Sequence, residues 1–197
     1  MITVRQIERL WTAKTYRKLV AELMSARPEA SVRLETALGR AVPAAALALI
    51  RLDELAQAHN PLSRKLLNVL LVGQELDGGW GDPLTTALCL RALFCGHGQG
   101  EAVQRALGYL ANMQKTEGIW PREPLRRMSA DAFTSAFILM QLGDHPLFRE
   151  AVRLTDALDW FAHNAATLDP ETAKLWDKAS LRCRARTVDA AHLAVWS

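Results

Sequence analysis

Apolar residues recur along most of this chain at the spacing of an α-helix, in two patterns that alternate. In segments 60–74 and 101–114 they keep to one stripe, as in a helix that covers a core with a single face. In segments 82–95 and 131–142 they occupy nearly the whole circumference, which is typical of a helix buried between other elements. The sequence therefore predicts an all-α protein in which amphipathic outer helices alternate with buried inner helices.

Three further helices are predicted before residue 60. The helical spacing of apolar residues places the first of them in 2–24. Pro28 suits the first turn of a second helix that runs to about Arg40. Pro43 opens a third helix, and because its apolar residues from 44 to 55 surround the axis, this helix is predicted to be buried.

Segments 66–80 and 106–120 are two copies of one pattern, forty residues apart. Each copy ends an outer helix with a glutamine and then passes through an acidic residue and a glycine to a tryptophan. A repeat of this length is typical of helical-repeat and toroid architectures. The glutamine is predicted to hydrogen-bond backbone groups of a neighbouring helix terminus, while the tryptophan ring packs over the turn. A structural role is therefore expected for Gln74, Trp80, Gln114 and Trp120.

Each of the two inner helices begins at an aspartate, Asp82 or Asp131, that can cap it. These aspartates are forty-nine residues apart, so the second copy has a nine-residue insertion, 121–129, after its tryptophan. A weaker third copy of the outer helix at 157–161 lacks the glutamine and the tryptophan. An inner helix at 189–196 is predicted to complete it.

The composition is that of an ordinary globular domain. A formal net charge of +3 over 197 residues is too small to indicate nucleic acid, and it does not exclude it. The chain is long enough to bury a core without disulfides or metal. We expect one domain, made of an N-terminal helical cap or extension, 1–57, and a repeat region, 58–197.

The cysteines and the N-terminus indicate a cytoplasmic protein. Cys89, Cys95 and Cys183 form no paired metal-binding spacing, so reduced thiols are expected. The N-terminal residues carry charges and no small-residue cleavage site, unlike a signal peptide. No apolar run reaches membrane-spanning length.

The segment 106–120 resembles the Gln-Trp motif of the α/α-toroid enzymes, in which a leucine and an aromatic residue precede the glutamine and Gly-x-Trp follows. Segments 74–81 and 135–144 look like the corresponding stretches of squalene and diterpene cyclases. The resemblance covers 60–144 well and 146–197 loosely. It implies a fold that terpene cyclases, protein prenyltransferase β-subunits and noncatalytic domains share.

The number of repeats implies an incomplete ring. The resembling enzymes close a toroid with about six helix pairs, whereas this chain provides about three to four. We therefore expect a partial α/α toroid, an α-α superhelix of three to four helix hairpins with an N-terminal helical extension.

The resemblance makes Asp131 a candidate catalytic residue. Class II terpene cyclases protonate their substrate with an aspartic acid in an Asp-x-Asp-Asp-Thr pattern at the start of an inner helix. In the matching place, 130–134, only the threonine agrees, and Ala130 stands at the position of the acid. Capping of the helix is the alternative role for the Asp131 carboxylate.

A zinc site like that of the prenyltransferases would be incomplete. Those β-subunits hold zinc with an Asp-x-Cys at one inner-helix start and a histidine at a later one. Asp131 and His192 match two of these ligands, and Phe133 replaces the cysteine. No metal is therefore assigned, and zinc belongs only to the alternative function. His192 is otherwise expected to be buried or to face a partner.

Two basic clusters are candidate binding sites. The inserted loop carries arginines where the resembling enzymes place cations for an isoprenoid diphosphate, and two phenylalanines could line a groove for its apolar chain. These residues are Arg122, Arg126, Arg127, Phe133 and Phe137. A second cluster would suit an acidic or phosphate-bearing partner, and it contains Lys178, Arg182, Arg184 and Arg186. For both clusters a solvated charged surface is the alternative.

Two functions of different classes follow. The sequence contains no Ser-His-Asp spacing, zinc-protease motif or phosphate-binding glycine loop, and an incomplete ring has apolar edges that a partner or a second copy can cover. We predict a noncatalytic helical-repeat interaction or scaffold module within a larger assembly, without a cofactor. The alternative is an isoprenoid-binding or cyclase/prenyltransferase-like subunit that holds an apolar chain in its groove and a diphosphate at the loop arginines.

Overall fold

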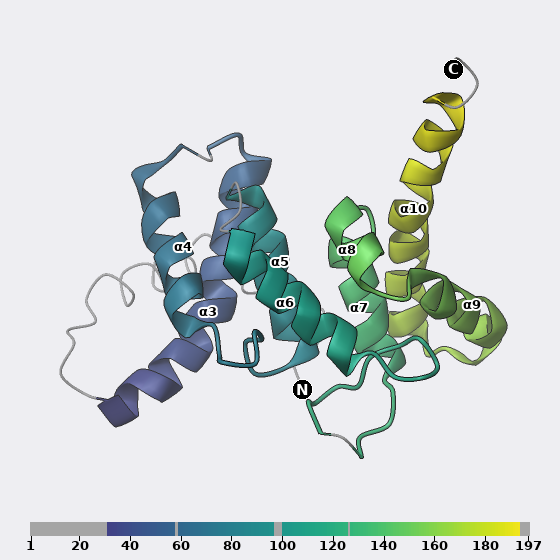
Figure 1. Cartoon of the computed structure of the whole chain (residues 1–197), viewed down its shortest axis with the longest axis horizontal. Coiled ribbons are helices and arrows are strands. Elements are labelled where there is room, and N and C mark those ends of the chain that lie inside the picture. The colour runs from purple at the N-terminus through teal and green to yellow at the C-terminus, as the bar shows by residue number, and fades with distance from the viewer. Residues whose placement is uncertain (1–30, 58, 97–99, 126, 194–197) are drawn as a thin grey trace. The chain divides into compact units, whose positions relative to one another are not determined.

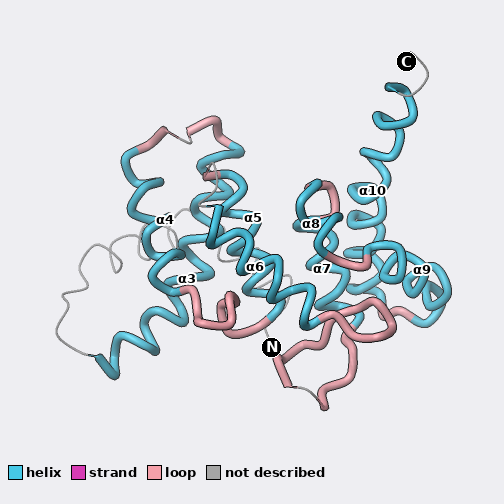
Figure 2. The backbone as a smooth tube through the Cα atoms, in the orientation of Figure 1, coloured by secondary structure: helices cyan, strands magenta, loops and turns pink. Residues whose placement is uncertain are grey.

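The computed structural model describes residues 31–57, 59–96, 100–125 and 127–193, with the backbone alone for 31–40 and 185–193. Within these ranges the chain forms eight α-helices and one 3-10 turn, joined by loops and without a strand (Figures 1 and 2). The prediction of an all-α fold is confirmed for this part of the chain. None of its helices is long and apolar enough to cross a membrane. The helix predicted at 2–24 lies outside the described residues.

The chain divides into two compact units, Met1–Gly73 and Gln74–Ser197, which are described separately. In the first unit, α3 (Ser31–Glu54) packs against α4 (Pro61–Gly73). The start of α4 is the predicted one, because the backbone N–H of Leu62 donates to Asn60 Oδ1 at 2.9 Å and Pro61 is the first helical residue.

The predicted break between two helices at Pro43 is wrong, because α3 runs through this proline without interruption. An interior proline costs about 3 kcal/mol through a lost hydrogen bond and a steric clash. Burial of one large aliphatic side chain contributes about 1.5–3 kcal/mol, so the several that α3 buries can outweigh that cost. The buried residues are Val42, Ala45, Ala46, Ala48, Leu49, Ile50 and Leu52.

In the second unit, three helices that each follow a capping aspartate pack in series, and we call them the inner helices. The first two are buried on most sides, whereas the third exposes one face. They are α5 (Pro83–Cys95), α7 (Ala132–Leu142) and α10 (Pro170–Leu193), and α7 contacts both of the others. The outer helix α6 (Gly100–Met113) packs against α5 and against the short α8 (Pro146–Ala151). A further outer helix, α9 (Leu154–Asn164), continues into the 3-10 turn Ala165–Thr167 before α10 begins.

All three inner helices begin with the same capping arrangement. An aspartate carboxylate accepts a hydrogen bond from the backbone N–H of a threonine three residues later, at 2.7–3.1 Å. The pairs are Asp82 with Thr85, Asp131 with Thr134, and Asp169 with Thr172. The prediction that the third inner helix starts at Asp189 is therefore wrong. The helix starts at Pro170, nineteen residues earlier, since Asp169 and Pro170 provide a cap and a first-turn proline.

Aromatic side chains fill the core of the second unit. Trp120, Phe148 and Phe161 are each 0% exposed. The Trp120 ring lies on that of Phe148 with the centroids 6.0 Å apart, and Phe161 stacks on Trp176 at 4.2 Å. The first contact joins Trp120, which lies between α6 and α7, to α8. The second joins α9 to α10.

Candidate functional site

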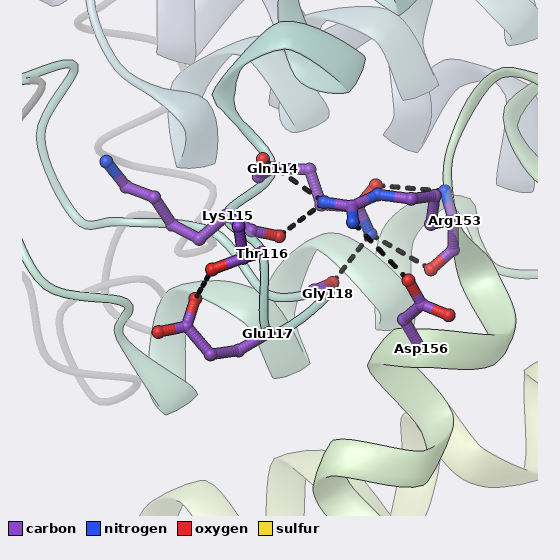
Figure 3. A network of polar contacts seen from close by, with 7 residues as sticks. All are labelled: Gln114, Lys115, Thr116, Glu117, Gly118, Arg153 and Asp156. Carbon is purple, nitrogen blue, oxygen red and sulfur yellow. Dashed lines mark hydrogen bonds and ion pairs between the residues drawn. The ribbon is translucent and has the colours of Figure 1, made fainter.

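The segment 114–120, which we call turn B, is held by the side chain of Gln114 (Figure 3). Its Nε2 donates to the carbonyl oxygens of Gly118 at 2.6 Å and Arg153 at 3.0 Å, and its Oε1 accepts the backbone N–H of Arg153 at 2.9 Å. Arg153 is the residue directly before α9. The glutamine thus satisfies backbone groups at the start of the next outer helix, as the sequence predicted.

The segment 74–80, turn A, repeats this arrangement in the first copy. Gln74 Nε2 donates to the carbonyl oxygens of Gly78 and Ala102, both at 2.9 Å. Ala102 lies in the first turn of α6. The difference is at the other end of the amide, since Gln74 Oε1 accepts a hydrogen bond from the guanidinium of Arg105 rather than from a backbone N–H.

The two turns contact equivalent positions of successive outer helices. The carbonyl partners Ala102 and Arg153 are fifty-one residues apart. The glycine of turn A lies against Arg105 and that of turn B against Asp156, which have the same separation. This is also the offset of the predicted third copy at 157–161, so α9 occupies the place of an outer helix.

Each turn is also bonded to the inner helix that follows it. The backbone N–H of Trp80 donates to Thr86 Oγ1 at 3.0 Å, and that of Trp120 donates to Ser135 Oγ at 2.9 Å. The Trp120 indole N–H donates in addition to the carbonyl of Leu110 at 2.7 Å. Turn B therefore joins α6, α7 and α9. The exposed residues are Glu75, Leu76 and Asp77 in turn A, and Thr116 and Glu117 in turn B.

The insertion forms a loop, 121–130, with a closed base. Pro121 and Ala130 pair as an isolated antiparallel bridge, and the N–H of Asp131 donates to the carbonyl of Trp120 at 2.8 Å. Arg122 and Arg127 are exposed, and within the described part of the chain neither forms an ion pair. The loop therefore offers cationic side chains on a defined backbone. The third predicted arginine, Arg126, lies outside the described residues.

The loop also exposes an apolar side chain. Leu125 is 55% exposed, and its carbonyl accepts the N–H of Met128 at 2.9 Å, which forms a turn at this point of the loop. Sequence reasoning selected the arginines of this loop and missed the leucine. An isolated leucine between charged residues gives no periodic signal.

The Asp131 carboxylate is used as a helix cap. Its Oδ1 accepts the N–H of Thr134 at 2.7 Å, as Asp82 does for Thr85 at the start of α5. Of the two phenylalanines predicted to line a groove, Phe137 is 4% exposed and Phe133 is half-buried. The Asp131 carboxylate therefore has the same capping role as those of Asp82 and Asp169 in the other two inner helices.

Asp131 and His192 are not brought together. Met140 and Gly143, at the end of α7, lie beside Arg182 and Cys183 of α10. His192 is nine residues further along α10, about 13 Å beyond that point by the rise of an α-helix, whereas Asp131 is at the opposite end of α7. Among the described residues, no three His, Cys, Asp or Glu side chains form a group that could hold a metal ion.

The basic cluster of α10 is partly used within the fold. Arg182 Nη1 donates to the carbonyl of Met140 at 2.7 Å, and its Nε lies 3.9 Å from Asp144. Arg182 thereby caps the end of α7. Lys178 and Arg184 are exposed, and the side chain of Arg186 lies outside the described residues.

The buried cysteines are poor nucleophiles. Burial, with a smaller contribution from the charge of Asp82, raises the pKa of the Cys89 thiol well above its ordinary value. Burial raises the pKa of the Cys183 thiol to about 11. Both are therefore protonated near neutral pH, which disfavours thiolate chemistry.

The sequence contains a local pattern that predicts the start of the third inner helix. Asp169-Pro170-Glu171-Thr172 has the same pattern as Asp82-Pro83-Leu84-Thr85, and it would have placed the start of α10.

Comparison with known proteins adds no family to this picture, since no family model, curated protein or solved structure matches the chain.

Proposed function

We propose that this chain is a noncatalytic helical-repeat module that binds a protein through the 121–130 loop. One observation carries the proposal: the loop has a closed base and exposes Arg122, Leu125 and Arg127 next to a repeat turn. Cations around an apolar side chain on a preorganised backbone suit a protein surface that carries carboxylates. The use of the Asp131 carboxylate as a cap supports a noncatalytic role.

The wider arrangement supports the partial α/α toroid that goes with this role. The inner helices α5, α7 and α10 contact one another in series, and turns A and B join successive outer helices. In such an array a loop inserted between an outer and an inner helix can vary without disturbing the packing of either.

Native mass spectrometry of the gently purified full chain tests the proposal. We expect a bound protein chain that is lost in the triple variant Arg122→Ser, Leu125→Ser, Arg127→Ser. The matched control is Arg64→Ser, Lys174→Ser, Leu181→Ser, which removes two cations and an exposed leucine from α4 and α10. A bound chain that both variants retain, or none in the wild type, would overturn the proposal.

An isoprenoid diphosphate is the second candidate ligand, favoured by Arg122 and Arg127 because neither is paired within the described residues. Titration of the full chain with farnesyl diphosphate, followed by calorimetry, tests this alternative. Saturable binding that Arg122→Ser with Arg127→Ser abolishes would favour it over the protein partner. A heat of titration that does not exceed the heat of dilution into buffer would eliminate this alternative.

A further inference from the structure

Two exposed leucines of the second unit lie among charges of opposite sign. Leu76, in turn A, is fully exposed between two exposed carboxylates. Leu125 is 55% exposed in a loop segment that carries two exposed guanidinium groups and one exposed carboxylate, that of Glu123. We call Glu75, Leu76 and Asp77 the acidic patch, and Arg122, Leu125 and Arg127 the basic patch. Single exposed leucines are common, but the exposed charged residues around these two differ in the sign of their net charge.

Hydrogen bonds hold the backbone of the acidic patch and the base of the loop that carries the basic patch. In the acidic patch, the N–H of Glu75 donates to the carbonyl of Gly79 at 2.9 Å, and the N–H of Gly78 donates to the carbonyl of Glu75 at 3.0 Å. The basic patch belongs to the loop whose base is closed by the bridge between Pro121 and Ala130. Docking at the acidic patch would therefore order few backbone torsions, which lowers its entropic cost.

Both patches lie at the same end of the second unit. The acidic patch leads into the N-terminus of α5 and the basic patch into that of α7, and these two inner helices pack against each other. Figure 1 shows both segments at the lower edge of this unit. One edge thus presents an acidic and a basic surface, each with a leucine.

We infer that this edge binds a second copy of the chain. A two-fold axis between the patches would place each acidic patch against the basic patch of the other copy, with Leu76 facing Leu125. Such an isologous contact pairs the acidic patch of each copy with the basic patch of the other. Both patches are then occupied, so the assembly is closed as a dimer. The second copy fits better than an unrelated acidic protein, because the edge itself carries the complementary acidic surface. The inference rests on the proposed function and names its partner.

Sedimentation velocity of the purified full chain tests the pairing. A concentration-dependent dimer is expected at low salt, and its dissociation constant should rise with added sodium chloride, because the Debye length falls from about 30 Å at 0.01 M to about 3 Å at 1 M. A wild type that stays monomeric at low salt would overturn the inference. That result would leave the proposed function open to its own test, which reads a bound chain of any kind.

Charge reversal locates the interface. One variant combines Glu75→Arg with Asp77→Asn, which keeps an oxygen to accept the N–H that Gly79 donates to Asp77. The other combines Arg122→Glu with Arg127→Glu. Each variant alone should raise the dissociation constant at least about tenfold, the effect of 1.4 kcal/mol. An equimolar mixture should recover a heterodimer, since both of its contacts then pair opposite charges.

The control reverses two cations elsewhere, with Arg64→Glu on α4 and Lys174→Glu on α10, both of which are exposed. It should leave the dimer as in the wild type. Circular dichroism of every variant checks that the helices are retained. A dimer that both patch variants keep, or one that their mixture fails to restore, would overturn the pairing.

Discussion

Turns A and B have the same backbone and differ in the group that donates to the glutamine oxygen. In turn B that donor is the N–H of Arg153 at the start of α9, and Gln114 is 9% exposed. In turn A it is the guanidinium of Arg105, and Gln74 is half-buried. A guanidinium can return to water when the glutamine is removed, whereas a backbone N–H at a helix start has few other partners.

One sequence motif can thus form the same backbone geometry twice, while its glutamine contributes a different amount to the free energy of unfolding in each copy. In both copies Nε2 bonds the turn's own glycine carbonyl and a carbonyl of the next outer helix. Besides the donor to Oε1, the two turns differ in how completely the glutamine side chain is shielded from water. We therefore expect equivalent substitutions to cost more in turn B wherever they affect the glutamine, and to cost the same where they affect the shared backbone.

The largest effect is expected for the glycine of each turn, which has φ +92° at Gly78 and +86° at Gly118. A Cβ at Gly118 would lie 2.5 Å from Asp156 Cβ, and one at Gly78 would overlap the carbonyl of Arg105. Gly118→Ala and Gly78→Ala should each lower the free energy of unfolding by about 2–3 kcal/mol. Urea denaturation followed by circular dichroism measures the loss.

Gly108 provides the control for this prediction. It lies in α6, and a Cβ there would meet nothing within 4 Å. Gly108→Ala should raise the free energy of unfolding by about 0.5–1 kcal/mol. A loss in this variant, or none in Gly118→Ala, would contradict the assigned backbone conformations.

The glutamines provide the direct test of the difference between the turns. Gln114→Met leaves three backbone groups without their partner and should cost about 2–3 kcal/mol. Gln74→Met should cost only about 1 kcal/mol, because Arg105 can be hydrated. Urea denaturation of both variants gives the comparison. Equal losses would show that the identity of the third donor has no energetic consequence.

The hydroxyl groups that accept the tryptophan N–H should have a smaller effect, similar in both copies. Ser135→Ala and Thr86→Val each leave a buried N–H unpaired, at an expected cost of about 1–2 kcal/mol. Thr86→Ser retains the hydroxyl and serves as the control. Hydrogen exchange at Trp80 and Trp120 should become faster only in the variants that lack it.

The smallest effect concerns the third copy, which has no glutamine. A hydrogen bond from the Thr172 hydroxyl, followed by one from its backbone N–H, lowers the pKa of the Asp169 carboxyl. Because the folded-state pKa is the lower one, this stabilisation is present above the unfolded value of about 3.9 and is lost as pH falls through the folded value. Asp169→Asn should reduce the acid-dependent decrease in Tm below about pH 4, and an unchanged decrease would contradict it.

The sequence predicted the elements whose signals are local. The caps at Asn60, Asp82 and Asp131 and the bonds of Gln114 all follow from side-chain chemistry within a few residues of a helix end. It failed where burial decides. Pro43 indicates a break locally, and the buried residues around it hold the helix together instead.

The third copy lacks the glutamine and tryptophan that mark the turn in the other two copies, so its inner helix was predicted to start at Asp189, whereas α10 begins at Pro170. The local signal for that start is the Asp-Pro-x-Thr pattern at 169–172, which also occurs at the start of α5. The same error brought His192 to an inner-helix start, where a zinc ligand would be needed. The arginines of the 121–130 loop could be found by their charge, but the exposure of Leu76 and Leu125 follows only from the folded surface.

The bonds of the two glutamines also fix an order of events during synthesis. Gln74 binds a carbonyl 28 residues later in the chain, and Gln114 binds one 39 residues later. On the ribosome, turn A cannot close until the start of α6 has emerged, and turn B has to wait for the start of α9. Among the described residues, no side-chain amide of the third copy bonds to a later helix, so its connection to α10 can close as soon as it is translated. Each of the first two copies is thus completed by the outer helix that follows it, and the third by local contacts.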